Sequence, residues 1–209
     1  MPALVILAAG ASRRLGTCKA LVDLGGQNAL ARLVEAGRAM DAATPLVVTG
    51  AHHDAIRAAV PLGVEVLFNP AWESGRTSGV ALASRARRGL DLAIAPVDVP
   101  LVPAEVFAAL CSAWIAHGSP ARGWLGPFLD QGSTDAPRVS FGHPVVIGRE
   151  LARDLCASGK DFPDRSPLAT LRDLRLRASP TLSIQVQSER ILDDLDTLED
   201  LERLRTLVS

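Results

Sequence analysis

Short apolar runs alternate with helical patterns through the first half of the chain, and this alternation constrains the fold more than any other feature. The expected strands cover residues 4–7, 46–49, 64–68 and 92–97, and the expected helices cover residues 29–40, 54–60, 78–88 and 104–116. These strands are continuously apolar, as are strands that helices cover on both faces. The pattern predicts an α/β fold with a Rossmann-like, mostly parallel and doubly wound sheet.

The second half of the chain has a less regular pattern. Residues 118–137 are rich in Gly, Pro, Ser and Asp, which predicts a long surface loop or a small excursion over the active face. Later strands are expected at residues 139–140, 145–147 and 182–186, and helices at residues 150–157, 168–174 and 198–207. A chain of 209 residues, 48% of them hydrophobic, is long enough for one sizeable core. We therefore expect residues 1–209 to form a single domain.

Composition and charge argue against two classes of partner. The formal net charge is -1 at pH 7, whereas proteins that coat nucleic acid usually present a basic face. The longest apolar runs, residues 4–9 and 92–97, are shorter than the roughly 18 residues that a membrane span needs. We expect neither a nucleic-acid partner nor a membrane partner.

The cysteines indicate a reducing compartment. Cys18, Cys111 and Cys156 are odd in number, far apart, and without metal-ligand spacing. This usage favours reduced thiols and a cytoplasmic location. The sequence leaves the oligomeric state open.

A glycine-rich loop, within the stretch LVILAAGASRRLGTCKAL at residues 4–21, follows the first expected strand. In an open parallel sheet, ligands bind at the carboxyl ends of the strands near the point where strand order reverses. Small residues at 8–11 let backbone N–H groups approach phosphate oxygens. Arg13, Arg14 and Lys19 add positive charge, and Lys19 is one of only two lysines in the chain.

Two familiar phosphate-binding motifs do not fit this loop. Gly10 and Gly16 are six residues apart and Lys19 is followed by alanine, so the loop is not a P-loop, and G-x-G-x-x-G is absent. An ordinary glycine-rich turn with solvated basic residues is the alternative.

The loop resembles the signature of the nucleotidyltransferases related to the molybdenum cofactor enzymes, the MobA-like NTP transferase family. That signature is L-A-(A/G)-G-x-S-x-R-(M/L)-G-x-x-K, and every fixed position matches. The resemblance implies a sheet of the nucleotide-diphospho-sugar transferase type and a loop that wraps a nucleoside triphosphate. It implies nucleotide contacts from Leu7, Ala8, Ala9 and Gly10. We assign phosphate neutralisation to Arg13 and Lys19 on the same basis.

Asp98 is the first candidate for a metal ligand. It lies in LAIAPVDVPLV, after a buried-type strand and before a proline turn, so its carboxylate should face the ligand crevice. One or two carboxylates are the usual protein ligands of Mg²⁺ bound to a substrate phosphate. The segment resembles the family's D-x-P element, whose aspartate binds the metal, with Val99 in the place of the common glutamine. The alternative is a turn residue or a cap of the next helix.

Asp194 and Asp196 are the second candidates, in DDLDTLEDLERL near the C-terminus. On an extended segment their side chains point to one side and Leu195 points into the core. The segment resembles the family's terminal D-I-D-T-P-E-D-L, with Leu198 in place of proline. We expect at least one of the two aspartates to bind the metal. A capping box formed by Asp196 and Glu199 is the competing interpretation.

Two further segments resemble family elements. NPAWESGRTSG is similar to N-P-x-W-x-x-G-x-x-S-(S/G), which places Gly75 and Ser78 near the base or ribose, although Ser78 would equally well cap its helix. Trp72 is expected to be a packing residue. FGHPVVIG is similar to the G-H-P-V element of the cytidylyl-transferring molybdopterin branch, which makes His143 an acceptor-binding candidate, with a structural role as the alternative.

Residues 138–181 are therefore the expected acceptor-side region, although the chain departs from the molybdopterin branch after FGHPVVIG. Lys160, Arg165 and Arg172 are either acceptor contacts or ordinary surface charges there.

The function that this resemblance implies is nucleotidyl transfer with Mg²⁺ as cofactor. A nucleoside triphosphate, with CTP preferred because LAAG is the form of the cytidylyl branch, would react with a phosphorylated small-molecule acceptor, for which molybdopterin is a candidate, and release pyrophosphate. Arg13, Lys19 and Asp98 are the expected catalytic residues. The alternatives are a sugar- or polyol-phosphate nucleotidyltransferase and a nucleotide-binding module without turnover.

Overall fold

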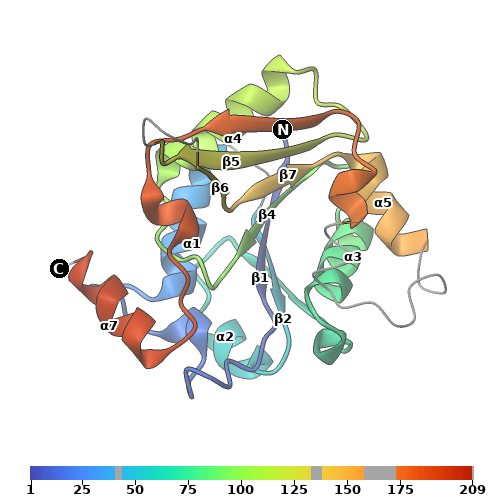
Figure 1. Cartoon of the computed structure of the whole chain (residues 1–209). Coiled ribbons are helices and arrows are strands. Elements are labelled where there is room, and N and C mark those ends of the chain that lie inside the picture. The colour runs from blue at the N-terminus through green and yellow to red at the C-terminus, as the bar shows by residue number, and fades with distance from the viewer. Residues whose placement is uncertain (41–43, 133–137, 158–172, 209) are drawn as a thin grey trace.

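The computed structural model describes residues 1–40, 44–132, 138–157 and 173–208. Its strands form one eight-stranded sheet in the order β3-β2-β1-β4-β7-β5-β6, with β8 also paired to β5. Helices lie on both faces of the sheet (Figure 1). The expected α/β class with a mostly parallel sheet is confirmed.

The first half of the chain builds the parallel part of the sheet. Its strands are β1 (Ala3–Ala8), β2 (Leu46–Thr49), β3 (Glu65–Phe68) and β4 (Leu92–Pro96). The helices between and after them are α1 (Ala29–Gly37), α2 (His53–Ala59), α3 (Arg76–Ala86) and α4 (Ala104–Ala116). β1 pairs in parallel with both β2 and β4, so the carboxyl ends of these three strands lie together at one edge.

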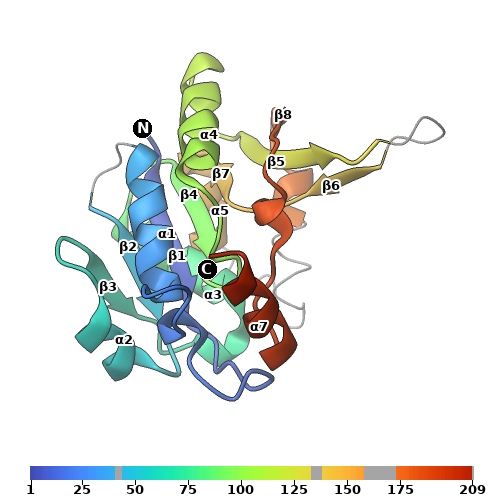
Figure 2. The same cartoon turned by 90° about the vertical axis from the view of Figure 1, so that its left-hand side faces the viewer.

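The second half adds antiparallel pairs to this sheet. Its strands are β5 (Trp124–Asp130), β6 (Val139–Phe141), β7 (Val145–Ile147) and β8 (Thr181–Gln185), with the helices α5 (Arg149–Ala157) and α7 (Leu198–Thr206). β7 runs antiparallel to both β4 and β5, and β5 runs antiparallel to β6 and parallel to β8. Figure 2 shows these strands beside the parallel half.

The prediction of a loop over residues 118–137 is wrong, because β5 lies within it. Trp124, Leu125 and Leu129 of this strand are buried, and β5 is paired along both edges. Gly126 and Pro127 interrupt the apolar run and give it the composition of a loop. Most of the predicted helix at residues 168–174 lies outside the described residues. The described part of it is helical, and this helical turn covers residues 173–176.

Two apolar cores cover the two faces of the sheet. Leu30 and Leu33 of α1 pack with Phe107 and Leu110 of α4 on one face. Val80 of α3 packs with residues 151, 152 and 155 of α5 on the other. In the described part of the chain, no helix combines the length and the apolar character that a membrane crossing requires.

Candidate active site

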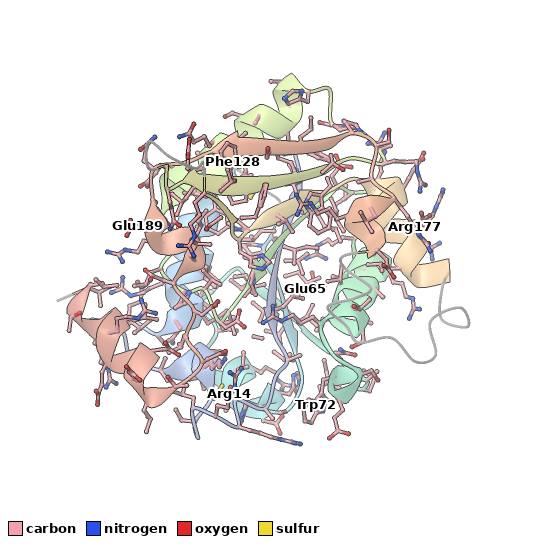
Figure 3. The ribbon with its side chains drawn as sticks, viewed as in Figure 1. Arg14, Glu65, Trp72, Phe128, Arg177 and Glu189 are labelled. Atoms are coloured by element: carbon pink, nitrogen blue, oxygen red, sulfur yellow. The ribbon has the colours of Figure 1, made fainter. Side chains whose placement is uncertain are left out.

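A pocket of about 300 Å³ lies at the carboxyl ends of β1 and β4. It is lined by residues 7–10, 12–14 and 18–20, by Trp72, Gly75, Arg76 and Gly79, by residues 96–98 and by Asp196. This volume is at the lower end of the range found for small-molecule sites. Figure 3 shows Arg14 and Trp72 at the end of the molecule toward which β1 runs.

The pocket brings together most of the residues that the sequence singled out. Those lining it are Leu7, Ala8, Ala9, Gly10, Arg13, Lys19, Gly75, Asp98 and Asp196. Ser78, His143 and Asp194 do not line it. The roles assigned to all of these residues remain predictions.

Backbone geometry fixes the shape of the glycine loop. Ser12 has a φ of 53°, in the left-handed region, and its hydroxyl oxygen accepts a hydrogen bond from the Lys19 N–H at 3.2 Å. The Gly16 N–H donates to the Ser12 carbonyl at 3.0 Å. These two bonds fold residues 12–19 into a compact turn, which carries Lys19 back toward the start of the loop.

The corner between β2 and α2 holds the other side of the loop. The Ala51 N–H donates to the Ala9 carbonyl at 3.1 Å, and the His52 Nε2 atom lies 3.2 Å from the Ala11 carbonyl oxygen. A Cβ atom on Gly50 would lie 2.4 Å from the Ala9 carbonyl oxygen, so only glycine permits this approach. The sequence contained no signal for His52.

Asp196 is neutralised by two cations from the glycine loop. Its Oδ1 atom contacts Lys19 Nζ, and its Oδ2 atom lies 2.6 Å from Arg14 Nη2. Partial desolvation opposes the shift, but the hydrogen bonds and charges of Lys19 and Arg14 lower the pKa of Asp196 below its ordinary value. Asp196 thus holds Lys19, whose side chain is 14% exposed, toward the pocket.

The assignment of the signature arginine to Arg13 needs a correction. In the pattern, the residue after Ser12 is variable and the fixed arginine is the next one, which is Arg14. Arg14 is the one of the two that pairs with Asp196. Both arginines line the pocket.

The C-terminal segment reaches the loop because its leucines pack against it. Leu195, Leu201 and Leu204 are buried in one cluster with Leu15 of the glycine loop, as the sequence predicted for Leu195. This cluster holds the backbone on both sides of Asp196 against the loop.

The predicted capping box of Asp196 and Glu199 is wrong by one residue. Thr197 is the N-cap of α7, its hydroxyl accepts from the Asp200 N–H, and the Asp200 side chain accepts from the Thr197 N–H. Threonine is a strong N-cap, and Asp200 at the third helical position completes the box. The Asp196 carboxylate is therefore available to Lys19 and Arg14.

Asp98 is the second residue after β4, and its backbone carbonyl accepts a 2.7 Å hydrogen bond from the Leu195 N–H. Its side chain is 15% exposed. The Oδ2 atom contacts the Arg76 guanidinium, whereas the Oδ1 atom is buried and has no hydrogen-bond partner among the described residues. Asp98 does not cap the next helix, because the N-cap of α4 is Pro103.

Asp194 stands close enough to Asp98 and Asp196 to be affected by their charges. Partial desolvation and these two carboxylates raise the pKa of Asp194. A divalent cation would relieve the repulsion among these three side chains and would give the buried Asp98 Oδ1 atom the partner that it lacks among the described residues. In the described residues no three His, Cys, Asp or Glu side chains are already gathered in a metal-binding arrangement.

Gly75 is the N-cap of α3, and Ser78 lies in the first turn of this helix. Gly75 has a φ of 94°, which favours glycine, and lines the pocket. The Ser78 hydroxyl lies 2.7 Å from the Gly75 carbonyl oxygen and accepts a 2.8 Å hydrogen bond from Asn69 Nδ2. The hydrogen bonds of the Ser78 hydroxyl thus stay within residues 69–78, and Gly75 rather than Ser78 is the N-cap of α3. Trp72 both lines the pocket and packs against Gly50.

His143 is half-buried in the turn between β6 and β7, beside the pair of Arg76 and Asp98. Its backbone N–H donates to the Ile191 carbonyl at 3.2 Å, and its Nδ1 atom is buried without a hydrogen-bond partner among the described residues. Burial and the Arg76 charge lower the pKa of His143 to about 4, against the opposing effect of Asp98. Lys160, Arg165 and Arg172 lie outside the described residues.

Arg76 is the main site residue that the sequence analysis missed. It is the first residue of α3 and lines the pocket. A signal was present, because a basic residue at the start of a helix is disfavoured by the helix dipole and needs a compensating carboxylate.

Comparisons with known proteins place the chain in a family. Residues 4–175 match the model of the MobA-like NTP transferase domain. No curated protein matches the chain by sequence. Several solved structures are similar in fold at low identity.

Rv0371c from Mycobacterium tuberculosis H37Rv is 22% identical, with a TM-score of 0.73 and coverage of 99% of both chains; it has also been solved in complex with manganese. A CMP:2-keto-3-deoxy-manno-octonic acid synthetase complexed with CTP is 15% identical, with a TM-score of 0.74 and coverage of 99% of this chain and 97% of that one.

Molybdopterin-guanine dinucleotide biosynthesis protein A from Archaeoglobus fulgidus is 18% identical, with a TM-score of 0.65 and coverage of 98% of this chain and 97% of that one. At these identities the structures show the fold of nucleotidyltransferases and nothing finer. The family match extends over most of the sequence and includes the glycine loop and Asp98. The chain therefore belongs to the MobA-like NTP transferase family.

Proposed function

We propose that this protein transfers a nucleoside monophosphate, preferably from CTP, to a phosphorylated small molecule and releases pyrophosphate, with Mg²⁺ as cofactor. The observation that carries the proposal is the position of Asp98. Asp98 lines the pocket that also contains Lys19 and the glycine loop, and its buried Oδ1 atom has no hydrogen-bond partner among the described residues. A carboxylate that needs a cation thus shares a pocket with backbone and basic groups suited to phosphates.

The glycine loop supplies the donor site in this proposal. The backbone of residues 7–10 borders the nucleotide, and Lys19 with Arg13 and Arg14 neutralises its phosphates. Gly75 would lie beside the base or ribose, since it lines the pocket with a φ of 94° that favours glycine. Ser78 positions this segment through its bonds to Asn69 and Gly75.

Asp98 would hold the cation, together with Asp194 or Asp196. The manganese complex of Rv0371c supports a divalent cation in a protein of this fold. A divalent cation held by these carboxylates would neutralise charge on the triphosphate and so make pyrophosphate a better leaving group. Whether or not Asp196 binds the cation, its carboxylate orients Lys19 through their ion pair.

Transfer requires positioning and charge neutralisation rather than a nucleophilic side chain. An oxygen of the acceptor phosphate, already ionised at neutral pH, forms a bond to the α-phosphorus. The bond from the α-phosphorus to the oxygen that bridges to the β-phosphate breaks, and pyrophosphate leaves with the electron pair. Lys19 stabilises the negative charge that grows on the phosphate oxygens.

The preference for CTP rests on the LAAG form of the loop, and the CTP complex of the octonic acid synthetase supports it. Molybdopterin remains a candidate acceptor because His143 lies in a G-H-P-V segment, and residues 138–181 are the acceptor side of what we propose to be one domain. A sugar- or polyol-phosphate acceptor is the second candidate, since the chain departs from the molybdopterin branch after this segment.

The test is a panel of the four nucleoside triphosphates, each combined with molybdopterin and several sugar and polyol phosphates, and scored by pyrophosphate release with Mg²⁺ and with EDTA. We expect one acceptor to react, CTP to be the best donor, and EDTA to stop the reaction. Tight nucleotide binding without turnover on any acceptor, and without an effect of Mg²⁺, would instead indicate a binding module.

A further inference from the structure

The ion pair between Arg76 and Asp98 has a position that helix stability does not explain. Arg76 is the first residue of α3 and directly follows the N-cap Gly75. A positive charge there faces the positive end of the helix dipole, where acidic side chains are favoured. Asp98, from the neighbouring strand end, compensates this charge. The Arg76 guanidinium thus pairs with the Asp98 carboxylate, which the proposed function assigns to the metal ion.

This pair satisfies only half of the Asp98 carboxylate. Arg76 contacts the Oδ2 atom, although a guanidinium can bind both oxygens of a carboxylate at once. The Oδ1 atom stays buried without a hydrogen-bond partner among the described residues, which is unfavourable for an ionised group. A ligand able to engage this oxygen would therefore supply an interaction that Arg76 does not make.

Arg76 is also less enclosed than Lys19, the more buried of the two cations on Asp196, of which the other, Arg14, is 71% exposed. The Arg76 side chain is 41% exposed, compared with 14% for Lys19. Lys19 is one of two cations on its carboxylate. Arg76 can thus leave Asp98 without breaking the network that shapes the glycine loop.

Without substrate, the described side chains of the site carry no excess of negative charge. The carboxylates of Asp98, Asp194 and Asp196 are matched by Arg14, Lys19 and Arg76, and Arg13, which also lines the pocket, adds a fourth positive charge. A bare divalent cation would make this group more positive still, whereas a triphosphate carries more negative charge than one such cation neutralises. The charges therefore favour joint entry of cation and nucleotide.

We propose that Arg76 is an exchangeable counter-ion of Asp98, which it leaves for a phosphate oxygen of the nucleotide when cation and triphosphate bind. Without ligands, its guanidinium neutralises Asp98 and opposes the binding of a cation alone. With both ligands, its planar donor fork binds phosphate. This inference rests on the proposed function, because it takes Asp98 as a cation ligand.

The first test is Mn²⁺ binding to the full chain without nucleotide, measured by electron paramagnetic resonance. Arg76→Gln should bind Mn²⁺ roughly tenfold more tightly than the wild type, because a positive charge beside the ligand is removed. Arg85→Gln is the matched control, since Arg85 is exposed on the same helix about 13 Å along its axis. Unchanged or weaker Mn²⁺ binding by Arg76→Gln would overturn the proposal.

The second test measures the affinity for α,β-methylene CTP in the presence of Mn²⁺. Arg76→Gln should bind this analogue about tenfold more weakly, the opposite direction to its effect on Mn²⁺ alone. A merely structural role would shift both affinities in the same direction. If the glutamine variant does not fold, Arg76→Lys, which keeps the charge, is the alternative variant. The Mn²⁺ affinity of Arg76→Lys should stay close to that of the wild type. A tenfold increase in this affinity would contradict the proposal.

Asp98→Asn separates this inference from the proposed function. If the variant still binds Mn²⁺ as the wild type does, the cation is held elsewhere and both proposals are wrong. If Asp98→Asn abolishes Mn²⁺ binding while Arg76→Gln leaves it unchanged, the cation site stands and only the counter-ion role is wrong.

Discussion

The nucleotide side and the acceptor side of this molecule are constructed in different ways. On the nucleotide side, the parallel strands β1 and β4 end next to each other, and the residues that follow them place Lys19 and Asp98 in one pocket. On the side that we assign to the acceptor, antiparallel strands carry His143 in a turn between β6 and β7. Parallel neighbours bring strand ends together whatever the connecting segments contain, whereas turns between antiparallel strands vary in length and content.

This difference suggests that donor chemistry is fixed by the sheet and that acceptor recognition is not. Substitutions on the nucleotide side should therefore stop the reaction with every acceptor. Substitutions on the other side should change the use of one acceptor while leaving nucleotide binding as it was.

Asp98→Ala should have the largest effect, a loss of pyrophosphate release of roughly a thousandfold or more with all acceptors, because it removes the proposed anchor of the cation. Pyrophosphate release and circular dichroism measure activity and folding. Asp154→Ala is the control, since it removes a carboxylate of α5 that pairs with Arg122 in the other half of the molecule. Substantial turnover by a folded Asp98→Ala protein would contradict the account of the nucleotide side.

Lys19→Ala should lower kcat by roughly a hundredfold to a thousandfold, the usual effect of removing a charged group that stabilises the transition state. The loss should again be independent of the acceptor. Arg153→Ala, at an exposed position of α5, should be close to wild type. A Lys19→Ala variant that is impaired with only one acceptor would break the proposed division between the two sides.

His143→Asn should raise KM for the acceptor about tenfold and leave KM for CTP unchanged, because the histidine lies outside the nucleotide pocket. Steady-state kinetics with each substrate varied in turn measure the two constants. If KM for CTP rises instead, His143 belongs to the nucleotide side.

The same variant tests the pH dependence of stability. The folded pKa of His143, about 4, lies below the ordinary value of 6.5, so between these pH values the unfolded chain binds more protons. Through this group, the free energy of unfolding should rise by roughly 3 kcal/mol between pH 4 and pH 7 and stay level at higher pH. Urea titrations across this range should show that His143→Asn lacks this contribution; equal slopes in both proteins would contradict the assignment.

Thr197→Ala should have a small effect, about 1 kcal/mol of lost stability, as expected for an N-cap. Glu199→Ala should cost almost nothing, because Asp200 rather than Glu199 completes the capping box. Urea unfolding of both variants measures the difference. A larger cost for Glu199→Ala would restore the cap predicted from the sequence.

The sequence predicted the nucleotide side well because its signals are local. β1, β2 and β4 are continuous apolar runs, and the residues after β1 and β4 carry recognisable motifs. β5 was missed because Gly126 and Pro127 resemble loop residues, and only its pairing on both edges makes it a strand. The partners of Asp196 were missed because they come from a loop that is distant in sequence, and packing of Leu195 brings them together.

The most direct measurement of the central claim is the linkage between Mn²⁺ and nucleotide binding, obtained by calorimetric titration of α,β-methylene CTP with and without Mn²⁺. In the wild type, Mn²⁺ should strengthen nucleotide binding at least about tenfold, and Asp98→Asn should remove this gain while Asp154→Asn keeps it. If Asp98→Asn retains the full gain, the cation does not join Asp98 to the triphosphate and the account is wrong.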